Sequence, residues 1–450
     1  MKRNESAESF VEGSVTKVVL KNVLPAMAAQ LMVLVYNLAD TFFIAQTHND
    51  YMVAAVSLAT PVFLIFMSLG TLFGIGGTSV ISRALGAGEK EYARKVSAFC
   101  MWGCVIVGGV LMILFWLCMD PLLKLLGASA DTMEYTREYL NIVISCGIFS
   151  MISNCYSNII RAEGKAGIAT TGTVVGNLLN VVLDPIMITA LGWNVAGAAI
   201  ATVVGNAVAA IYYIIYFLRG QSSLSISIRE ASVKDGICSG VLAIGIPAAL
   251  GTLLISVSQV IANAQMAIHG DLSVAAYGVA SKVVMIVAMV GLGVGMGVQP
   301  LLGFCYGAKD TERFHGILKF SCFLGLGICI FCGLLCFAFT EPIVKVFLTE
   351  AAALADGLTF TRIFISTAWL FGLYYVLLNA LQAMGAATPS FIVSVCRQGI
   401  IYIPAVFVMG AVMGASGLVW AQPVADVLSL LLVAVLLVVQ LKKKQAFENK

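Results

Sequence analysis

Residues 168–191, IATTGTVVGNLLNVVLDPIMITAL, are long and apolar enough to cross the roughly 30 Å hydrocarbon core of a membrane as one helix. The chain as a whole is 60% hydrophobic and only 11% charged, whereas soluble domains carry about a quarter charged residues. The sequence therefore predicts an all-α integral membrane protein and excludes a soluble one. Twelve apolar runs could cross the membrane, near 18–45, 52–82, 96–118, 138–160, 168–191, 195–217, 238–268, 273–306, 317–340, 358–383, 388–410 and 415–440.

Basic residues give the expected orientation of the twelve helices. Of the 26 Lys and Arg residues, twenty fall in the termini and in loops on one side. The other side holds four, and two more, Lys282 and Arg397, lie within the apolar runs. Because cytoplasmic loops are enriched in Lys and Arg, both termini are expected in the cytoplasm. The protein is expected in the plasma membrane. The first 16 residues lack an apolar core, so no cleaved signal peptide is expected.

An internal repeat divides the chain. Leu24-Pro25-Ala26 corresponds to Ile246-Pro247-Ala248, and Asn158 corresponds to Asn379, at offsets of 222 and 221 residues. We therefore expect a first lobe of six helices at 1–217, a cytoplasmic linker at 218–236 and a second six-helix lobe at 237–450. Two lobes related by a parallel repeat are a transporter architecture.

Polar residues interrupt the run quoted above. Asn177, Asn180 and Asp184 are spaced i, i+3 and i+7, so they share one face of a helix. Pro185 has no N–H and leaves the carbonyl of Val181 without its helical partner. Freed carbonyl oxygens beside a carboxyl are ligands for a small cation.

Asp40 is a second acid within an apolar run of the first lobe. At about 1.5 Å rise per residue, Asp40 lies about 25 Å and Asp184 about 24 Å from the cytoplasmic starts of their helices. Asn180 and Thr202 lie within one or two turns of that level. A proton or sodium site made by Asp40, Asn180, Asp184 and Thr202 is one interpretation. The alternative is that the acids only bond Asn, Thr and Tyr36 side chains to hold the helices together.

Four segments resemble the multidrug and toxic compound extrusion (MATE) family: LPAMAAQLMVLVYNLADTFFIA at 24–45, NLLNVVLDP, ISRALGAGEKEYARK at 81–95, and IIRAEG at 159–164. The resemblance implies a secondary antiporter that exports amphipathic, often cationic compounds in exchange for H⁺ or Na⁺ by rocker-switch alternating access. In its DinF-like and related bacterial branches, it further implies an ion site in the first lobe. The roles map onto Asp40, Asn180, Asp184 and Thr202, with Tyr36 and Asn177 alongside, and Pro25 lies where helix 1 of that branch bends.

The second lobe departs from other branches of the family, which place acids on helices 7 and 10, because residues 238–268 and 358–383 contain no Asp or Glu. A second ion site in this lobe is therefore not expected. Gln259 and Asn263 are expected in a polar cavity wall for the substrate, together with Asn37 and Met289. The buried charges Lys282 and Asp426 are expected to form a structural pair, with Arg397 nearby.

Several expectations concern what the protein acts with. We expect a monomer that contacts an amphipathic small molecule and membrane lipid, with no nucleic acid, no organic cofactor and no metal beyond a coupling Na⁺. Only three His residues occur, each in or near a loop and without a paired metal motif, so an enzyme is not expected. A lipid-linked precursor flippase of the same fold superfamily is the alternative function.

Overall fold

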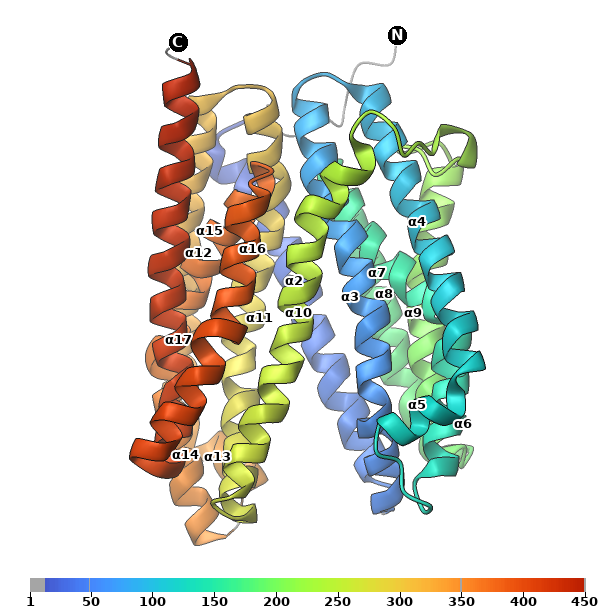
Figure 1. Cartoon of the computed structure of the whole chain (residues 1–450), viewed down its shortest axis with the longest axis vertical. Helices are drawn as coiled ribbons and strands as arrows, with labels where there is room; N and C mark the ends of the chain where they lie inside the picture. The colour runs from blue at the N-terminus through green and yellow to red at the C-terminus, as the bar shows by residue number, and fades with distance from the viewer. Residues whose placement is uncertain (1–12, 48, 349, 449–450) are drawn as a thin grey trace. The chain divides into compact units, whose positions relative to one another are not determined.

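A computed structural model of the protein describes residues 13–47, 49–348 and 350–448. In this part of the chain every regular element is a helix (Figure 1). The N-terminal Lys2 and Arg3 that were counted for orientation lie outside the described residues. The elements are α2 (Val15–Ala45), α3 (Asp50–Gly86), α4 (Lys90–Leu117), α5 (Met119–Leu125), α6 (Met133–Ser145), α7 (Gly147–Ala162), α8 (Ala166–Asp184), η1 (Pro185–Ala190), α9 (Asn194–Leu218), η2 (Ile228–Glu230), α10 (Ile237–Ala267), α11 (Asp271–Gly307), α12 (Thr311–Ala338), α13 (Thr340–Phe347), α14 (Ala351–Ala368), α15 (Leu370–Ala383), α16 (Ala387–Val395), η3 (Cys396–Tyr402) and α17 (Ile403–Glu448).

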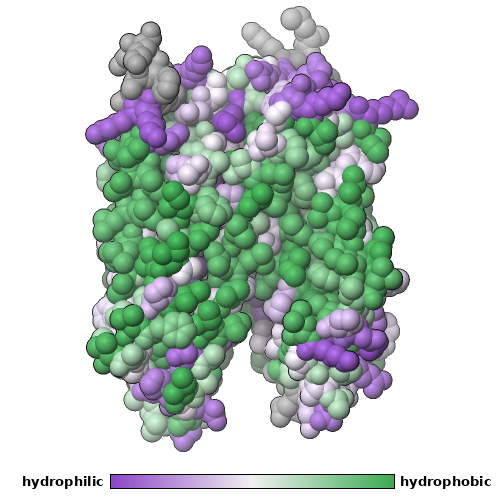
Figure 2. Space-filling model, viewed as in Figure 1, coloured by the Kyte–Doolittle hydropathy of each residue, from purple (hydrophilic) through white to green (hydrophobic). Residues whose placement is uncertain are grey.

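The helices are those of a multi-pass membrane protein. Among the described residues, nine helical segments are long and apolar enough to cross a membrane, and two bent pairs, α6 with α7 and α14 with α15, raise the number to 11. The 57-residue segment 387–443 contains Gly414 in a non-helical conformation, with φ of 64°. Counting the two sides of Gly414 separately gives the twelve spans that the sequence predicts. Hydrophobic residues cover the middle of the helices, and hydrophilic residues gather at their ends (Figure 2).

Two compact units make up the chain. Of the described residues, those within 28–245 form unit 1, and those within 13–27 and 246–448 form unit 2. The chain therefore passes from one unit to the other inside α2, between Met27 and Ala28, and again inside α10, between Gly245 and Ile246. These boundaries differ from the lobe boundaries expected at the linker. Pro25 and Pro247 each lie two residues from a boundary, and each removes one hydrogen bond from its helix.

The internal repeat is visible in the packing of each unit. In unit 1, a Cβ added to Gly74 of α3 would lie 3.0 Å from the Asn158 side chain of α7. In unit 2, a Cβ added to Gly295 of α11 would lie 2.5 Å from the Asn379 side chain of α15. Both pairs are separated by the same offset of 221 residues, so equivalent helices meet through equivalent glycines.

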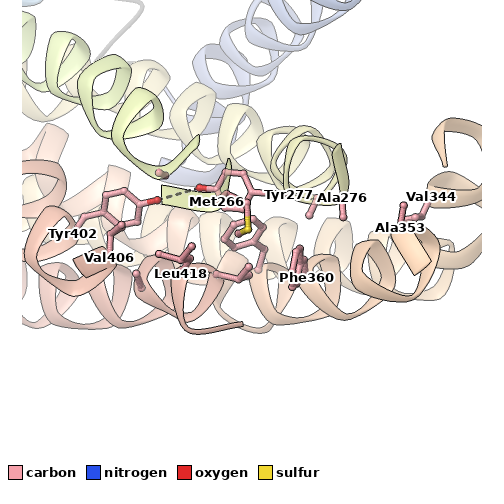
Figure 3. Packing of buried hydrophobic residues seen from close by; sticks show 14 of the residues in the cluster. Met266, Ala276, Tyr277, Val344, Ala353, Phe360, Tyr402, Val406 and Leu418 are labelled. Atoms are coloured by element: carbon pink, nitrogen blue, oxygen red, sulfur yellow. Dashed lines mark hydrogen bonds between the residues drawn. The ribbon is translucent and has the colours of Figure 1, made fainter. Parts of the chain in front are cut away.

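Unit 2 has a buried core in which one polar contact is enclosed. Met266, Tyr277, Phe360, Tyr402 and other apolar residues of α10, α11, α14, η3 and α17 form this core (Figure 3). The hydroxyls of Tyr277 and Tyr402 lie 3.1 Å apart and form a hydrogen bond. Because each hydroxyl has a partner, the two tyrosines can be buried without leaving a polar atom unsatisfied.

The segment between α9 and α10 is fixed to unit 1. Glu163, buried at the end of α7, accepts hydrogen bonds from the Tyr216 hydroxyl at 3.1 Å, from the Ser222 hydroxyl at 2.8 Å and from the backbone N–H of Ser223. Further contacts join Trp102 Nε1 to the Ile226 carbonyl, Arg94 to Glu230, and the Tyr92 hydroxyl to the Asp235 carbonyl. The expected linker is thus an integral part of unit 1.

Replacing Glu163 by Ala should lower the melting temperature of the purified protein, because it removes the acceptor that the Tyr216 hydroxyl, the Ser222 hydroxyl and the Ser223 N–H share. A hydrogen bond to a charged group contributes about 1.5–3 kcal/mol. Burial raises the pKa of Glu163 above its usual value of 4.5, although its hydrogen bonds oppose this shift. The stabilising effect of this raised pKa is complete below about 4.5 and is lost as the pH rises through the folded-state pKa. Glu163→Gln should therefore flatten the dependence of the melting temperature on pH.

The measurement is the midpoint of thermal unfolding in detergent, followed by size-exclusion chromatography. Glu89→Ala is the matched control, since Glu89 is exposed and makes no side-chain cap hydrogen bond. Equal melting temperatures for Glu163→Ala and Glu89→Ala would contradict the role given to Glu163.

Candidate ion site in unit 1

The centre of the site lies where α8 and α9 touch. Asn180 and Asp184 on α8 and Thr202 on α9 are buried, with 2%, 0% and 3% of their surface exposed. Asn180 Nδ2 donates a hydrogen bond to the Thr202 hydroxyl at 3.3 Å. The i, i+4 spacing of Asn180 and Asp184 places both on the face of α8 that meets α9.

Two glycines allow this close approach. A Cβ added to Gly176 would lie 2.5 Å from the Gly205 carbonyl oxygen, and one added to Gly205 would lie 2.6 Å from the Gly176 carbonyl oxygen. The backbones of α8 and α9 are therefore in direct contact one turn from Asn180. Small residues at a helix–helix contact in a membrane permit such a distance.

The part of α2 in unit 1 supplies Asp40 and Tyr36. The carboxyl groups of Asp40 and Asp184 are near enough to interact electrostatically, and both interact with the Tyr36 hydroxyl. The structure thus brings Asp40, Asn180, Asp184, Thr202 and Tyr36 together within unit 1. Their role as ion ligands remains a prediction.

Tyr139 of α6 belongs to the same cluster and was missed by the sequence analysis. Its hydroxyl interacts electrostatically with Asp40, Tyr36 and Asp184, and 6% of its surface is exposed. The helix holding Tyr139 bends by 52° between Ser145 and Gly147. The signal in the sequence was a Tyr at the outer end of the apolar run at 138–160.

Four side-chain oxygens in this cluster have no hydrogen-bond partner among the residues that the structure describes: Asp40 Oδ1, Asn180 Oδ1 and both carboxyl oxygens of Asp184. Buried polar atoms are paired in the great majority of cases, because an unpaired one costs about 1–3 kcal/mol. Two carboxyls and an amide with free acceptor oxygens can be satisfied by protons on the carboxyls or by a hard cation, which prefers oxygen ligands. The chemistry of the cluster therefore fits cation or proton binding.

At Pro185 the helix changes type. The π-helix η1 begins at Pro185 and runs to Ala190, directly after Asp184. The interruption that Pro185 was expected to cause thus takes the form of a wider turn, and the Thr189 hydroxyl donates to the Pro185 carbonyl. Such π-turns inside α-helices are frequent at functional sites.

The other candidate residues make no hydrogen bond with this cluster in the described part of the chain. Asn177 is half-buried and, in the described part of the chain, makes no hydrogen bond with the cluster residues. Asn37 is half-buried and donates to the Val33 carbonyl at 2.9 Å. In unit 2, Gln259 and Asn263 are exposed and lie 3.5 Å apart, and Met289 is half-buried. Their place in a substrate cavity remains a prediction.

The expected pair of Lys282 with Asp426 is wrong. Asp426 pairs instead with Arg397, at 3.0 Å between Arg397 Nη2 and Asp426 Oδ1. Lys282 is exposed, while its neighbours Val283 and Val287 are the buried residues of α11. Lys282 therefore projects from the face of α11 opposite to the one that packs in unit 2. Among the residues that the structure describes, no group of three or more His, Cys, Asp or Glu could hold a metal ion.

Both repeats of the chain match known proteins. The MatE family model matches residues 25–186 and again residues 247–408, which correspond to the two repeats. The multidrug export protein MepA of Staphylococcus aureus (strain MRSA252) is 29% identical over 440 residues, covering 98% of this chain and 96% of that protein. MepA of Staphylococcus saprophyticus is 28% identical over 448 residues, covering 100% and 98%.

Solved structures show the same fold. A multidrug resistance MATE family transporter of the MOP superfamily, in an outward-facing conformation, superposes with a TM-score of 0.92 at 23% identity, covering 99% of this chain and 100% of that one. The MATE transporter VcmN of Vibrio cholerae superposes with a TM-score of 0.89 at 23% identity, covering 97% and 98%.

Proposed function

Because this chain belongs to the MATE family, matched in both repeats, we propose that it exports amphipathic, often cationic compounds in exchange for H⁺ or Na⁺. The relatives that cover nearly the whole chain are multidrug export proteins, which supports drug export over the flipping of a lipid-linked precursor. The protein acts as a monomer in the plasma membrane, with both termini in the cytoplasm.

One observation carries the exchange part of this proposal. Asp40, Asn180 and Asp184 present four buried oxygens without a protein partner, and the cluster lies among α2, α6, α8 and α9 of one unit. Binding of H⁺ or Na⁺ neutralises the repulsion between two adjacent carboxylates and removes the cost of their burial. An ion with such a preference can drive transport, provided that its affinity differs between two states of the protein.

The course of α2 suggests how the ion acts. Asp40 lies in the part of α2 that belongs to unit 1, whereas Pro25 lies in the part that belongs to unit 2. Cation uptake at Asp40 changes α2 near Pro25, where the helix already lacks one backbone hydrogen bond. The two units then alternate as rocking bodies, releasing the drug outside and the ion inside.

Transport by purified protein in proteoliposomes tests this proposal, with a fluorescent cationic dye such as ethidium as the substrate. A pH gradient and a sodium gradient are imposed in separate experiments, each with and without an ionophore that collapses it. We expect one of the two ion gradients to drive the dye against the concentration gradient of the dye. The ionophore that collapses this ion gradient should stop the dye movement. If neither gradient drives dye movement in folded protein, ion-coupled drug export is wrong.

A further inference from the structure

Unit 2 buries one ion pair deep among its helices. Arg397 and Asp426 are 6% and 4% exposed. Asp426 Oδ1 accepts hydrogen bonds from Arg397 Nη2 at 3.0 Å and from Arg397 Nε at 3.3 Å, and a third from Gln422 Nε2 at 2.8 Å. Breaking a buried pair of this kind leaves an uncompensated charge and is strongly destabilising.

Aromatic rings of α15 hold the guanidinium in place. Arg397 Cζ lies 4.5 Å from the ring centroid of Tyr374, 5.2 Å from that of Phe371 and 5.6 Å from that of Tyr375. Arg397 Nη1 also donates to the Tyr375 hydroxyl at 3.3 Å. Stacking on aromatic faces stabilises a desolvated cation, so the rings hold the guanidinium in addition to Asp426.

The repeat relates Arg397 to the candidate ion site of unit 1. Gly164 and Gly385 precede equivalent helices, and both have left-handed backbones, with φ of 85° and 72°. Gly176 is the twelfth residue after Gly164, and Arg397 is the twelfth residue after Gly385. Arg397 therefore occupies, in unit 2, the position of the glycine at which α8 touches α9.

Asp426 lies at the corresponding place on the partner helix. Gly192 and Gly414 are again left-handed, with φ of 67° and 64°. Gly205 is the thirteenth residue after Gly192, and Asp426 is the twelfth after Gly414. The positions of the two pairs in the repeat agree to within one residue. The ion pair in unit 2 thus stands where Gly176 contacts Gly205 in unit 1.

We propose that the Arg397 guanidinium is a built-in cation of unit 2, which neutralises Asp426 permanently and so prevents this half of the repeat from taking up a coupling ion. In unit 1 the carboxyl oxygens beside the helix contact have no protein partner, whereas in unit 2 the equivalent region holds a carboxylate with its own cation attached. The comparison with unit 1 rests on the proposed function of the Asp40 and Asp184 cluster. The prediction for Asp426 itself does not.

A carboxylate at Asp426 without Arg397 would have few other partners. Besides Arg397, the titratable groups that interact electrostatically with Asp426 are the hydroxyls of Tyr374 and Tyr402, and Gln422 is the remaining hydrogen-bond donor. Tyr402 already shares a hydrogen bond with Tyr277. When a neutral side chain replaces Arg397, Asp426 must take up a proton or a small cation to stay buried.

The test measures how the thermal stability of purified protein responds to cations. The variants of this first test carry Asp40→Asn and Asp184→Asn, which removes the acids of the unit 1 site. With the native pair, we expect the melting temperature to be the same in choline and in sodium. With Arg397→Gln added, we expect the melting temperature in choline to fall between about pH 5 and about pH 8 by about 5 °C or more beyond the fall measured with the native pair. Sodium at the higher pH, or acid, should restore it. If the melting temperature of the Arg397→Gln variant responds neither to sodium nor to pH, the proposal is overturned.

If Arg397→Gln does not fold, adding Asp426→Asn gives the second measurement. The proposal expects this neutral pair to restore folding, because the uncompensated carboxylate is then gone. Failure of the neutral pair to fold would overturn the proposal in favour of a purely steric need for Arg397.

A third variant carries only Arg397→Met and Asp426→Asn, with Asp40 and Asp184 intact. It should respond to sodium and pH as the wild type does. If this variant loses the response of the melting temperature to sodium and pH that the wild type shows, the proposal is also overturned. If instead the wild type shows no cation response, the ion site of unit 1 is wrong, while the result for Arg397→Gln still decides the role of Arg397.

Discussion

Asp40→Asn should fold normally and lose ion-driven dye transport almost completely. Asp40 Oδ1 is one of the buried oxygens without a protein partner, and its carboxyl interacts with Asp184, Tyr36 and Tyr139. An amide has nearly the shape of the carboxyl, but near neutral pH it can neither take up a proton nor carry the negative charge that binds a cation. The variant therefore keeps the packing of α2 and loses the exchange of an ion for the drug.

The measurement is dye transport in proteoliposomes under the gradient that drives the wild type. A binding measurement, with the dye and without a gradient, is made on the same preparation. Because Asp40→Asn removes coupling rather than the substrate site, dye binding should stay within about twofold of the wild type, a difference of less than 0.5 kcal/mol.

Asp120→Asn is the matched control for an Asp outside the cluster. Asp120 is exposed at the start of α5, where it pairs with Arg137. Such surface pairs contribute little, so Asp120→Asn should transport as the wild type does. Gradient-driven transport that survives in folded Asp40→Asn would show that the ion binds elsewhere.

Gly176→Ala should destabilise unit 1 and weaken its cation response at the same time. The added methyl group would lie 2.5 Å from the Gly205 carbonyl oxygen and 3.0 Å from the Ala209 methyl group. Both contacts are too short, so α8 and α9 must move apart, at a cost of about 1–3 kcal/mol or more for overpacking. This movement separates Asn180 from Thr202, whose hydrogen bond is already 3.3 Å long.

Gly167→Ala in the same helix separates this effect from helix propensity. A Cβ on Gly167 meets no atom within 4 Å, and Ala favours a helix by about 1 kcal/mol over Gly. The control should therefore be as stable as the wild type or more so. Melting temperature and its shift with sodium or pH are measured for both variants. If Gly176→Ala has the same melting temperature as Gly167→Ala and keeps the cation response, the contact between α8 and α9 described above is contradicted.

Periodicity and charge were sufficient to predict the helices and most of the unit 1 cluster. Asn180 and Asp184 share a helix face because of their spacing alone, and the depth of Asp40 follows from the rise of an α-helix. Tyr139 could not be predicted in the same way, because its helix bends by 52° after Ser145. A depth counted along a straight helix gives no information on which neighbours a bent segment faces.

The pairing in unit 2 was beyond such reasoning for a related cause. The sequence predicted that Lys282 pairs with Asp426, with Arg397 nearby, but which base pairs with the acid depends on the direction of each side chain. Arg397 lies in the π-helix η3, which shifts the helical phase, and Lys282 lies on the exposed face of α11. The unit boundaries were hidden as well, because the polar segment 218–236 marks a change of composition and not the place where the compact units divide.

The passage of the chain between units inside α2 and α10 has a consequence for biogenesis. During synthesis, residues 13–27 emerge long before the rest of unit 2, and residues 237–245 complete unit 1 only after all its other described helices have been made. The described part of unit 2 is not a continuous stretch of sequence, and unit 1 extends past the sixth membrane helix into α10. A ribosome that has finished the sixth membrane helix has therefore not yet supplied a complete folding unit. The two halves are therefore interdependent in assembly, and the early segment of α2 must wait in the membrane for partners that are translated last.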